Sequence, residues 1–432
     1  MSSALADRLL AALPAAAGAD AAAARAAFAA AGLPDRKVEA WRFSTLGGME
    51  SLDPTAGFVD SLGLPELSGI AGTLVECAGG QDVLADTLPD GVTVVSAAAA
   101  PVGAGSAREL VATETENDRG QSPLPQSAAP HGLQSRTARA QAFRWLAHAG
   151  AAEELQVDVT APVSGIWRLA WQHNTAGLAQ SRCRVRVRSG ASISLVEHHF
   201  GSDVAAGLAN RLLAIEVEDG ASLTWIRVQE TGAKAQSVQH SDVRVAAGGR
   251  FALVALELGG LWSRHTLALD LAAAGSEARV AGLVALQGRQ HHDTQLSLAH
   301  SAGGASSRTL WKAIANQRAR SVFNGLITVA PGADQTEAHL KTSNLLLSPH
   351  AEIDTKPELV IEADEVVCSH GATVGQLDDR ALFYLRSRGI PEAQARQMLT
   401  LAFGGEVLSA IDSPDLRAAL AERVSTHLPQ SA

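Results

Sequence analysis

In the middle of the chain, apolar and polar residues alternate at every second position over short runs. Such alternation is typical of β-strands that bury one face. It occurs in residues 185–188, 215–218 and 243–245, and again in residues 191–195, 221–225 and 251–256. A glycine separates the earlier run from the later one in each pair, so the pattern predicts a strand, a glycine corner and a second strand.

These glycines recur at a nearly constant interval. They stand at positions 190, 220, 249, 275, 304 and 332, which are 26–30 residues apart. A repeat of this length indicates a stacked solenoid, and the two-residue alternation excludes helical repeats. We therefore predict a mainly β protein with a parallel β-helix over residues 146–376. Roughly eight turns at about 4.8 Å each give a rod of about 40 Å.

Helical regions are predicted on both sides of the solenoid. In an N-terminal region, 1–145, residues 4–31 predict two helical segments broken near Pro14, and residues 72–96 predict two or three short strands. Residues 112–137, rich in Ser, Gln, Pro and Thr, predict a mobile surface loop. In a C-terminal helical domain, 377–432, helices are expected after Leu377, from Pro391, and from Pro414 to His427. These last helices would cap the solenoid or bind a partner.

Composition narrows the functional classes. The 432 residues carry a net charge of −10, and only 4% are aromatic. Small residues suit the narrow interior of a β-helix, and an acidic chain without a basic face is a poor partner for nucleic acid. No apolar run reaches 18 residues, and Asp7 and Arg8 interrupt the Ala-rich N-terminus. We therefore predict a cytoplasmic protein without a membrane span.

Motifs of conventional enzymes are missing from the sequence. It contains no P-loop, no His-Glu-x-x-His, no Cys-x-x-Cys and no Gly-x-Ser-x-Gly. Its three cysteines are Cys77, Cys183 and Cys368, too few to hold an ordinary iron–sulfur cluster within one chain. Cys77 and Cys183 are interpreted as structural residues.

Histidines are numerous, with 14 in the chain. Stacked coils could bring several together as metal ligands. For each one taken singly, a place on a polar outer face or at a coil corner is the favoured interpretation. The histidines considered are His198, His199, His240, His265, His291, His292, His300, His339 and His350.

Residues 350–371 hold the densest group of candidate ligands. In a strand, His350, Glu352, Asp354, Lys356 and Glu358 would share one face. Cys368 and His370 are two residues apart, so an extended backbone points both the same way. A thiol beside an imidazole forms a plausible soft metal or sulfur site, although two ligands leave it incomplete. Alternatively, Cys368 is an ordinary small buried residue.

Several longer motifs resemble one known family. They occupy residues 316–325, 336–347, 356–361, 368–375 and 381–390, with an earlier motif at 33–43. Together they are similar to the SufB/SufD family of iron–sulfur cluster assembly proteins. Thr355-Lys356-Pro357 and Gly371 stand where the SufB branch has a cysteine and a glutamate, so the SufD branch fits better.

This resemblance implies a right-handed parallel β-helix that acts as a non-catalytic scaffold. It implies pairing with SufB through the β-helices and docking of the SufC ATPase on the C-terminal helices. His370, with Cys368 as a weaker candidate, would meet a transient iron–sulfur cluster at the SufB interface. No permanent cofactor is expected, a flavin is possible in the complex, and the isolated chain could form a homodimer. The partner-binding candidates are Tyr384, Arg386, Arg388, Met398 and Phe403.

Two alternatives come from other functional classes. A β-helix enzyme acting on polysaccharides would have the same coil pattern, but the scarcity of aromatic residues and the lack of a signal peptide count against it. A pure interaction rod would use Cys368 and His370 only for packing.

Overall fold

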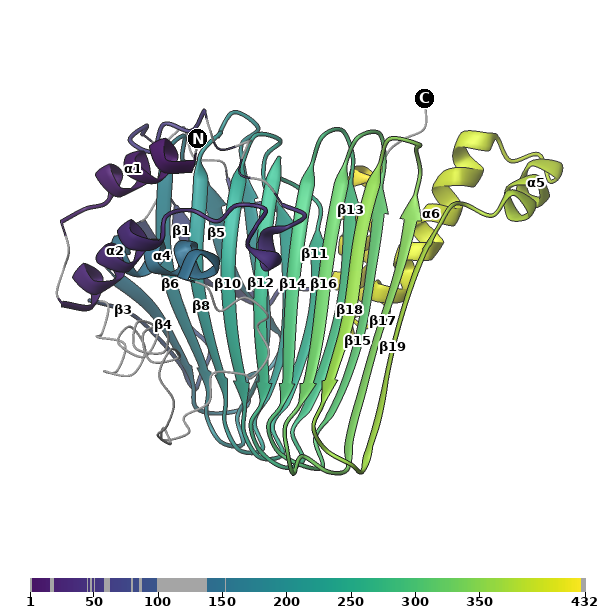
Figure 1. Ribbon diagram of the computed structural model, residues 1–432. Coiled ribbons are helices and arrows are strands. Elements are labelled where there is room, and N and C mark those ends of the chain that lie inside the picture. Colours follow the sequence, from purple (N-terminus) through teal and green to yellow (C-terminus); the bar gives the residue numbers. More distant parts are fainter. Residues whose placement is uncertain are drawn as a thin grey trace.

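Two β-sheets face each other along the length of the molecule and form its body (Figure 1). The computed structural model describes residues 2–15, 19–44, 46, 49, 51–57, 63–78, 81–84, 88–98, 138–151 and 153–428. Within the solenoid, successive strands of the chain alternate between the two sheets, so each turn contributes one strand to each sheet. The predicted parallel β-helix of about eight turns, flanked by helices, is thereby confirmed.

Among the described residues, one sheet has ten strands and the other has nine. In the same part of the chain, neighbouring strands of the solenoid are parallel, and antiparallel pairing is limited to β1–β2 and β3–β4. The ten-stranded sheet contains β1 (Gly72–Ala78), β2 (Gln81–Leu84), β5 (Ile166–His173), β7 (Ser192–Gly201), β9 (Ser222–Glu230), β11 (Arg250–Glu257), β13 (Glu277–Leu286), β15 (Ser306–Ala315), β17 (Thr336–Leu346) and β19 (Val366–Gly375). The nine-stranded sheet contains β3 (Val92–Ala98), β4 (Glu153–Val159), β6 (Leu178–Val187), β8 (Leu208–Val217), β10 (Gln236–Val245), β12 (Trp262–Leu271), β14 (His291–His300), β16 (Arg320–Val329) and β18 (Glu352–Ile361).

Glycines turn the chain from one sheet to the other, as the repeat predicted. Gly220 has a φ of 63°, a conformation that a side chain would disfavour, and it lies between β8 and β9. At the next corner Gly248 has a φ of 61°, so it, and not the neighbouring Gly249 counted in the repeat, occupies the left-handed position.

Outward-facing charges on neighbouring strands pair across the coils. In β6, Val185 and Val187 point into the core, while Arg186 faces outward and binds Glu216 of β8 at 2.8 Å. Arg188 similarly contacts Glu218 at 3.1 Å. The alternation of the sequence is thus fulfilled on both sides of the strand.

Helices cover the outer faces of the two sheets. The N-terminal group is α1 (Ser2–Ala12), α2 (Ala19–Ala31), the short 3-10 helices η1 (Glu39–Trp41) and η3 (Ala138–Gln141), and α4 (Ala142–Gly150). Its apolar residues share a core with Leu208, Val238 and Trp262 on the nine-stranded sheet. The C-terminal group is α5 (Asp379–Ser387), α6 (Glu392–Leu408) and α7 (Pro414–His427).

The C-terminal helices match their predicted starts closely. Asp378 caps α5, Pro391 directly precedes α6, and α7 begins at Pro414. Helices α6 and α7 pack on the outer face of the ten-stranded sheet, where Leu420 and Val424 join Ile226 and Leu256 in one core. They therefore cover a face of the solenoid rather than its end. In Figure 1, α5 projects beyond β19.

Other predictions have mixed outcomes. The two N-terminal helices and the three short strands in residues 72–96 are confirmed. The predicted loop at 112–137 lies outside the described residues. Among the described helices, none is both long and apolar enough to cross a membrane.

Candidate functional site

The C-terminal end of the solenoid is open. Strands β18 and β19 form its last coil, and each pairs with one neighbour only among the described strands, β16 and β17 respectively. Their side chains are largely accessible, with Val367 and Val374 exposed at 61% and 48%. Unpaired strand edges and exposed valines are features of a surface that another chain can cover. We call this last coil the open end.

Cys368 and His370 both lie on the inward face of this last coil. In the register of β17 and β19, Cys368 stands beside Ala338 and His370 beside Leu340, and both neighbours are buried in the core. Cys368 is half-buried, while His370 is exposed because none of the described coils covers it. Burial raises the pKa of the Cys368 thiol above its ordinary value. The two predicted ligands therefore share one face, with the imidazole at the surface and a protonated thiol beside it.

The acidic segment before them is engaged in ion pairs. Glu352 and Asp354 contact Arg320 of β16 at 3.3 and 2.7 Å. Lys356 lies between Glu39 and Glu358, at 3.1 and 3.0 Å. His350 lies in the turn before β18. Within the described ranges, no group of three or more His, Cys, Asp or Glu residues could hold a metal ion.

The predicted partner-binding residues divide into two groups. Tyr384 and Met398 are exposed at 57% and 44%, and Arg388 lies over the Tyr384 ring at 5.2 Å. Arg386 contacts Glu392 at 3.6 Å. Phe403 instead packs against β15, where Lys312 lies 4.5 Å from its ring and donates a hydrogen bond to its carbonyl. Phe403 thus anchors α6 to the solenoid.

Phe383 is a surface residue that the sequence analysis did not single out. It lies next to Tyr384 on α5 and is exposed at 72%. Its signal in the sequence is a large apolar side chain between Leu382 and Tyr384, outside the apolar stripe formed by Ala381, Leu382 and Leu385. An exposed pair of aromatic rings on a projecting helix is typical of a docking surface.

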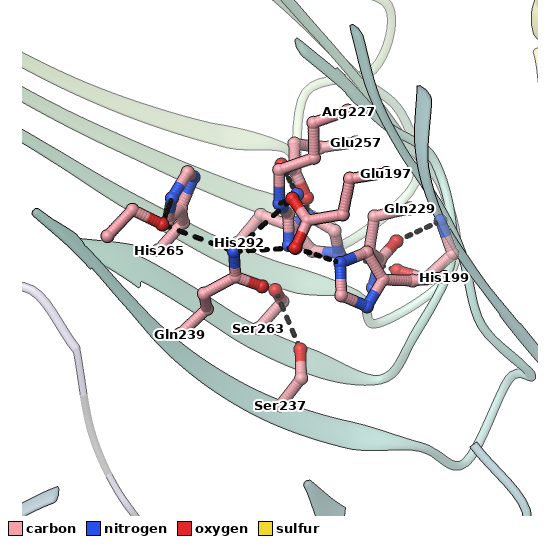
Figure 2. A network of polar contacts seen from close by, with 12 residues as sticks. Glu197, His199, Arg227, Gln229, Ser237, Gln239, Glu257, Ser263, His265 and His292 are labelled. Carbon is pink, nitrogen blue, oxygen red and sulfur yellow. Dashed lines mark hydrogen bonds and ion pairs between the residues drawn. The ribbon is translucent and has the colours of Figure 1, made fainter. Parts of the chain in front are cut away.

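The interpretation as coil-corner or outer-face residues is wrong for the clustered histidines that point into the solenoid, whereas His198 and His240 lie on outer faces that helices cover. His198, His199, His240, His265, His292 and His300 are all buried. His199, His265 and His292 point into the solenoid, where His199 contacts Glu197, His292 lies 3.9 Å from Glu257 and His265 contacts Ser241 (Figure 2). Burial holds the pKa of His199 and His265 well below the ordinary value, and lowers that of His292 to about 3. These imidazoles are therefore neutral at physiological pH.

A second polar cluster lies under the N-terminal segment, outside the solenoid. Buried Arg264 pairs with Asp293 and lies 4.0 Å from the Trp41 ring. The Ser44 hydroxyl donates its proton to Asp293, so His291 Nε2, 3.0 Å away, must donate to Ser44. Ser44 is buried, and the carboxylate that accepts its proton is held by Arg264, so the cluster fixes the N-terminal segment on β14 rather than forming a nucleophile.

Known protein families include one that matches more than half of the chain. Residues 170–403 match the family model for the SufBD core domain, described as SUF system FeS cluster assembly. The chain belongs to the SufB/SufD family. The SufD-type assignment is supported by 35% identity over 254 residues to the iron–sulfur cluster assembly protein SufD of Escherichia coli, covering 59% of this chain.

Other relatives point to the same family. An iron–sulfur cluster assembly SufBD family protein of Synechocystis is 36% identical over 216 residues, half of this SufD-type chain. One from Mycobacterium tuberculosis is 28% identical over 285 residues, or 64% of the chain. The matches span 60% of the Escherichia coli protein, 48% of the Synechocystis protein and 68% of the mycobacterial one.

Proposed function

We propose that the protein is a non-catalytic scaffold subunit of a cytoplasmic SUF complex, which pairs with SufB through its open end and docks the SufC ATPase on its C-terminal helices. The iron–sulfur cluster is the cargo of this complex, and a flavin would belong to the complex as a whole. The proposal is carried by one observation: the solenoid ends in an uncovered coil that presents His370.

The geometry of the open end favours a second β-helix as the partner. The edges of β18 and β19 offer backbone hydrogen-bonding groups, and the inward side chains of the last coil would be covered by a further coil. A coil placed there would lie over His370 and Cys368. Ligands from two chains would then complete a site for which this chain supplies only one or two.

Helix α5 supports the second contact. It projects away from the solenoid and exposes Phe383 and Tyr384, so a partner could bind there while the open end is occupied. The chain has no P-loop of its own. Docking an ATPase on α5 would supply the nucleotide chemistry from another subunit.

Co-expression with the SufB and SufC of the same source, followed by mass measurement, tests the assembly. We expect one complex that contains all three chains. A chain that stays monomeric, or forms only the homodimer of the isolated protein, would refute the pairing.

A substitution at the open end tests the site. His370→Ala should leave the complex intact but impair anaerobic reconstitution of the cluster from iron and sulfide. Normal reconstitution with intact assembly would favour an interaction rod in which His370 has no metal role.

A further inference from the structure

Charged residues occupy the interior of the solenoid in its central coils. Glu197 of β7, Arg227 of β9 and Glu257 of β11 are each exposed by 2% or less. They face inward because Glu197 and Arg227 are register partners, two residues after Leu195 and Trp225, which lie in the apolar core. Buried charges are costly unless they are paired, so their contacts decide what they do.

These residues form one connected group (Figure 2). Arg227 pairs with Glu257 and lies 3.6 Å from Glu197. Glu197 also contacts His199 at 3.1 Å and accepts a hydrogen bond of 3.0 Å from Gln239. Gln239 donates to Ser241 at 3.1 Å, and Ser241 contacts His265 at 3.0 Å. We call these seven residues, Glu197, His199, Arg227, Gln239, Ser241, Glu257 and His265, the interior network.

The network joins both sheets and several successive coils. Glu197, Arg227 and Glu257 come from three neighbouring strands of the ten-stranded sheet, whereas Gln239 and His265 come from β10 and β12 of the other. Its contacts therefore depend on how each strand is aligned with the strand before it and with the opposite sheet.

Apolar alternation alone leaves this alignment ambiguous. A slip of one residue would turn apolar side chains outward, but a slip of two residues keeps every side chain on its original face. The loops that follow β7, β9 and β11 differ in length. Loop length therefore does not impose the same alignment between strands in every coil. A two-residue slip between β7 and β9 would displace Glu197 from Arg227 by about 7 Å along the strands, so their contact would be lost and each buried charge would keep fewer partners.

The network does not extend to the open end. Beyond it the interior is filled by Trp311 of β15 and Phe323 of β16, whose rings stack with centroids 5.1 Å apart. Gly282 makes room for the indole, because a Cβ there would lie 2.2 Å from Trp311. This aromatic layer separates the network from Leu340 and His370, so the network is not a route to that site.

We propose that the interior network sets the register of the central coils by making two-residue slips unfavourable. The network acts as a conformational device of the fold, independent of any partner. By fixing the register, it also fixes where the later coils, and with them His370, lie relative to the helices on the outer faces.

Cysteine pairs on the outer face can report the register. Ser194 and Thr224 are register partners, whereas Ser194 and Ser222 would become partners after a two-residue slip, and all three are half-buried. The experiment compares oxidative crosslinking of Ser194→Cys/Thr224→Cys with that of Ser194→Cys/Ser222→Cys, in the full chain after unfolding and refolding. The chain without these substitutions controls for its three native cysteines.

Replacing the charged residues of the interior network by neutral ones should reduce the preference for crosslinking the in-register cysteine pair over the slipped pair. In the Glu197→Gln/Arg227→Met/Glu257→Gln background, we expect the ratio of in-register to slipped crosslinking to fall by about tenfold, which corresponds to about 1.4 kcal/mol. The matched control is Leu253→Met, an equally buried apolar position of β11, which should leave the ratio unchanged.

An unchanged ratio in the neutral background would overturn the proposal. It would mean that the glycine corners between the strands set the register. If the triple variant does not fold, Glu197→Gln replaces it, because this variant neutralises one side of the contact between β7 and β9 and keeps the pair of Arg227 and Glu257. It should show a smaller fall in the same ratio, and a ratio equal to that of the unsubstituted network would again overturn the proposal.

Discussion

At the scale of single residues, His370 owes its accessibility to its position in the stack. Its register partner Leu340 is 2% exposed, because the coil of β19 covers it, whereas nothing among the described residues covers β19 in turn. The same inward position is therefore a core site in one coil and a surface site in the next. An imidazole placed there is free to bind a ligand at little cost to the fold.

His370→Ala is accordingly expected to change the free energy of unfolding by less than about 0.5 kcal/mol, as is usual for exposed positions. In the assembled complex it should strongly reduce the iron and sulfide retained after anaerobic reconstitution. His339→Ala is the matched control, since His339 of the adjacent strand faces outward and its Nδ1 contacts Ser369 at 2.7 Å. Equal loss in both variants would argue against a specific role of His370.

Cys368 differs from His370 because it is half-buried and its thiol pKa is raised by burial. A raised pKa lowers the thiolate fraction at neutral pH, and the thiolate is the reactive form. Iodoacetamide should therefore modify Cys368 of the isolated folded chain more slowly at pH 7.5 than the same residue in the denatured chain. Site-resolved mass spectrometry measures both rates, and equal rates would show that the thiol is not protected.

At the scale of elements, the C-terminal helices differ in what holds them. Helix α7 buries Leu416, Leu420 and Val424 against the ten-stranded sheet, and its Arg423 binds Glu230 of β9 at 2.9 Å. Helix α5 packs against α6 and leaves both of its aromatic rings in solvent. Stability and partner binding should therefore depend on different helices.

For α7 we expect Leu420→Ala to lower the free energy of unfolding by about 2–5 kcal/mol, because it opens a cavity between helix and sheet. Glu422→Ala on the exposed side of the same helix should change it by less than about 0.5 kcal/mol. Thermal or denaturant unfolding of the two variants measures the difference. Similar values for both would mean that α7 contributes little to the folded core.

For α5 the expected pattern is reversed. Phe383→Ser/Tyr384→Ser removes exposed rings, so the melting temperature should stay close to that of the parent chain while affinity for SufC falls at least about tenfold, as for the loss of a docking anchor. Phe403→Ala should instead lower stability, since that ring packs against Lys312. Titration calorimetry with purified SufC gives the affinities, and unchanged binding by the serine variant would place the docking surface elsewhere.

At the scale of the whole molecule, the repeat and the alternation were sufficient to predict the β-helix. Both follow from backbone geometry: strands alternate faces, and corners need residues such as Gly220 that tolerate a positive φ. The shared face of Cys368 and His370 followed from the same alternation. The covering of one sheet face by α6 and α7 did not, because helix packing depends on side chains far apart in the sequence, such as Ile226 and Leu420.

The interior network was missed although the alternation contained its signal. Glu197 and His199 have the same parity as Leu195, and Arg227 has that of Trp225, so a strict extrapolation would have placed them inside. Their charge argued for solvent instead. The pairing that makes burial tolerable comes from residues one or two coils away, such as Glu257 and Gln239, and is not visible in a single strand.

Burial of so many histidines has a consequence for the whole molecule. Desolvation lowers the pKa of nine of them: His148, His173, His198, His199, His240, His265, His291, His292 and His300. As the pH falls below 6.5, the unfolded chain takes up protons on these groups, whereas the folded chain takes them up only at lower pH, about 4 for His300 and about 3 for His148 and His292. Stability is therefore present above pH 6.5 and falls as the pH decreases, by about 1 kcal/mol per pH unit for each such group.

Acid should thus unfold the protein steeply below pH 6, before the carboxylates with lowered pKa values, such as Glu230, are protonated. Denaturant unfolding at several pH values measures the slope. His300→Gln is a suitable single variant, since burial lowers the pKa of His300 to about 4 and its Nε2 contacts Ser307 at 2.9 Å, a bond that an amide can replace. In this variant, the free energy of unfolding should fall less steeply with decreasing pH, by about 1 kcal/mol per pH unit. If stability instead falls only below pH 4.5, acid unfolding is due to carboxylates.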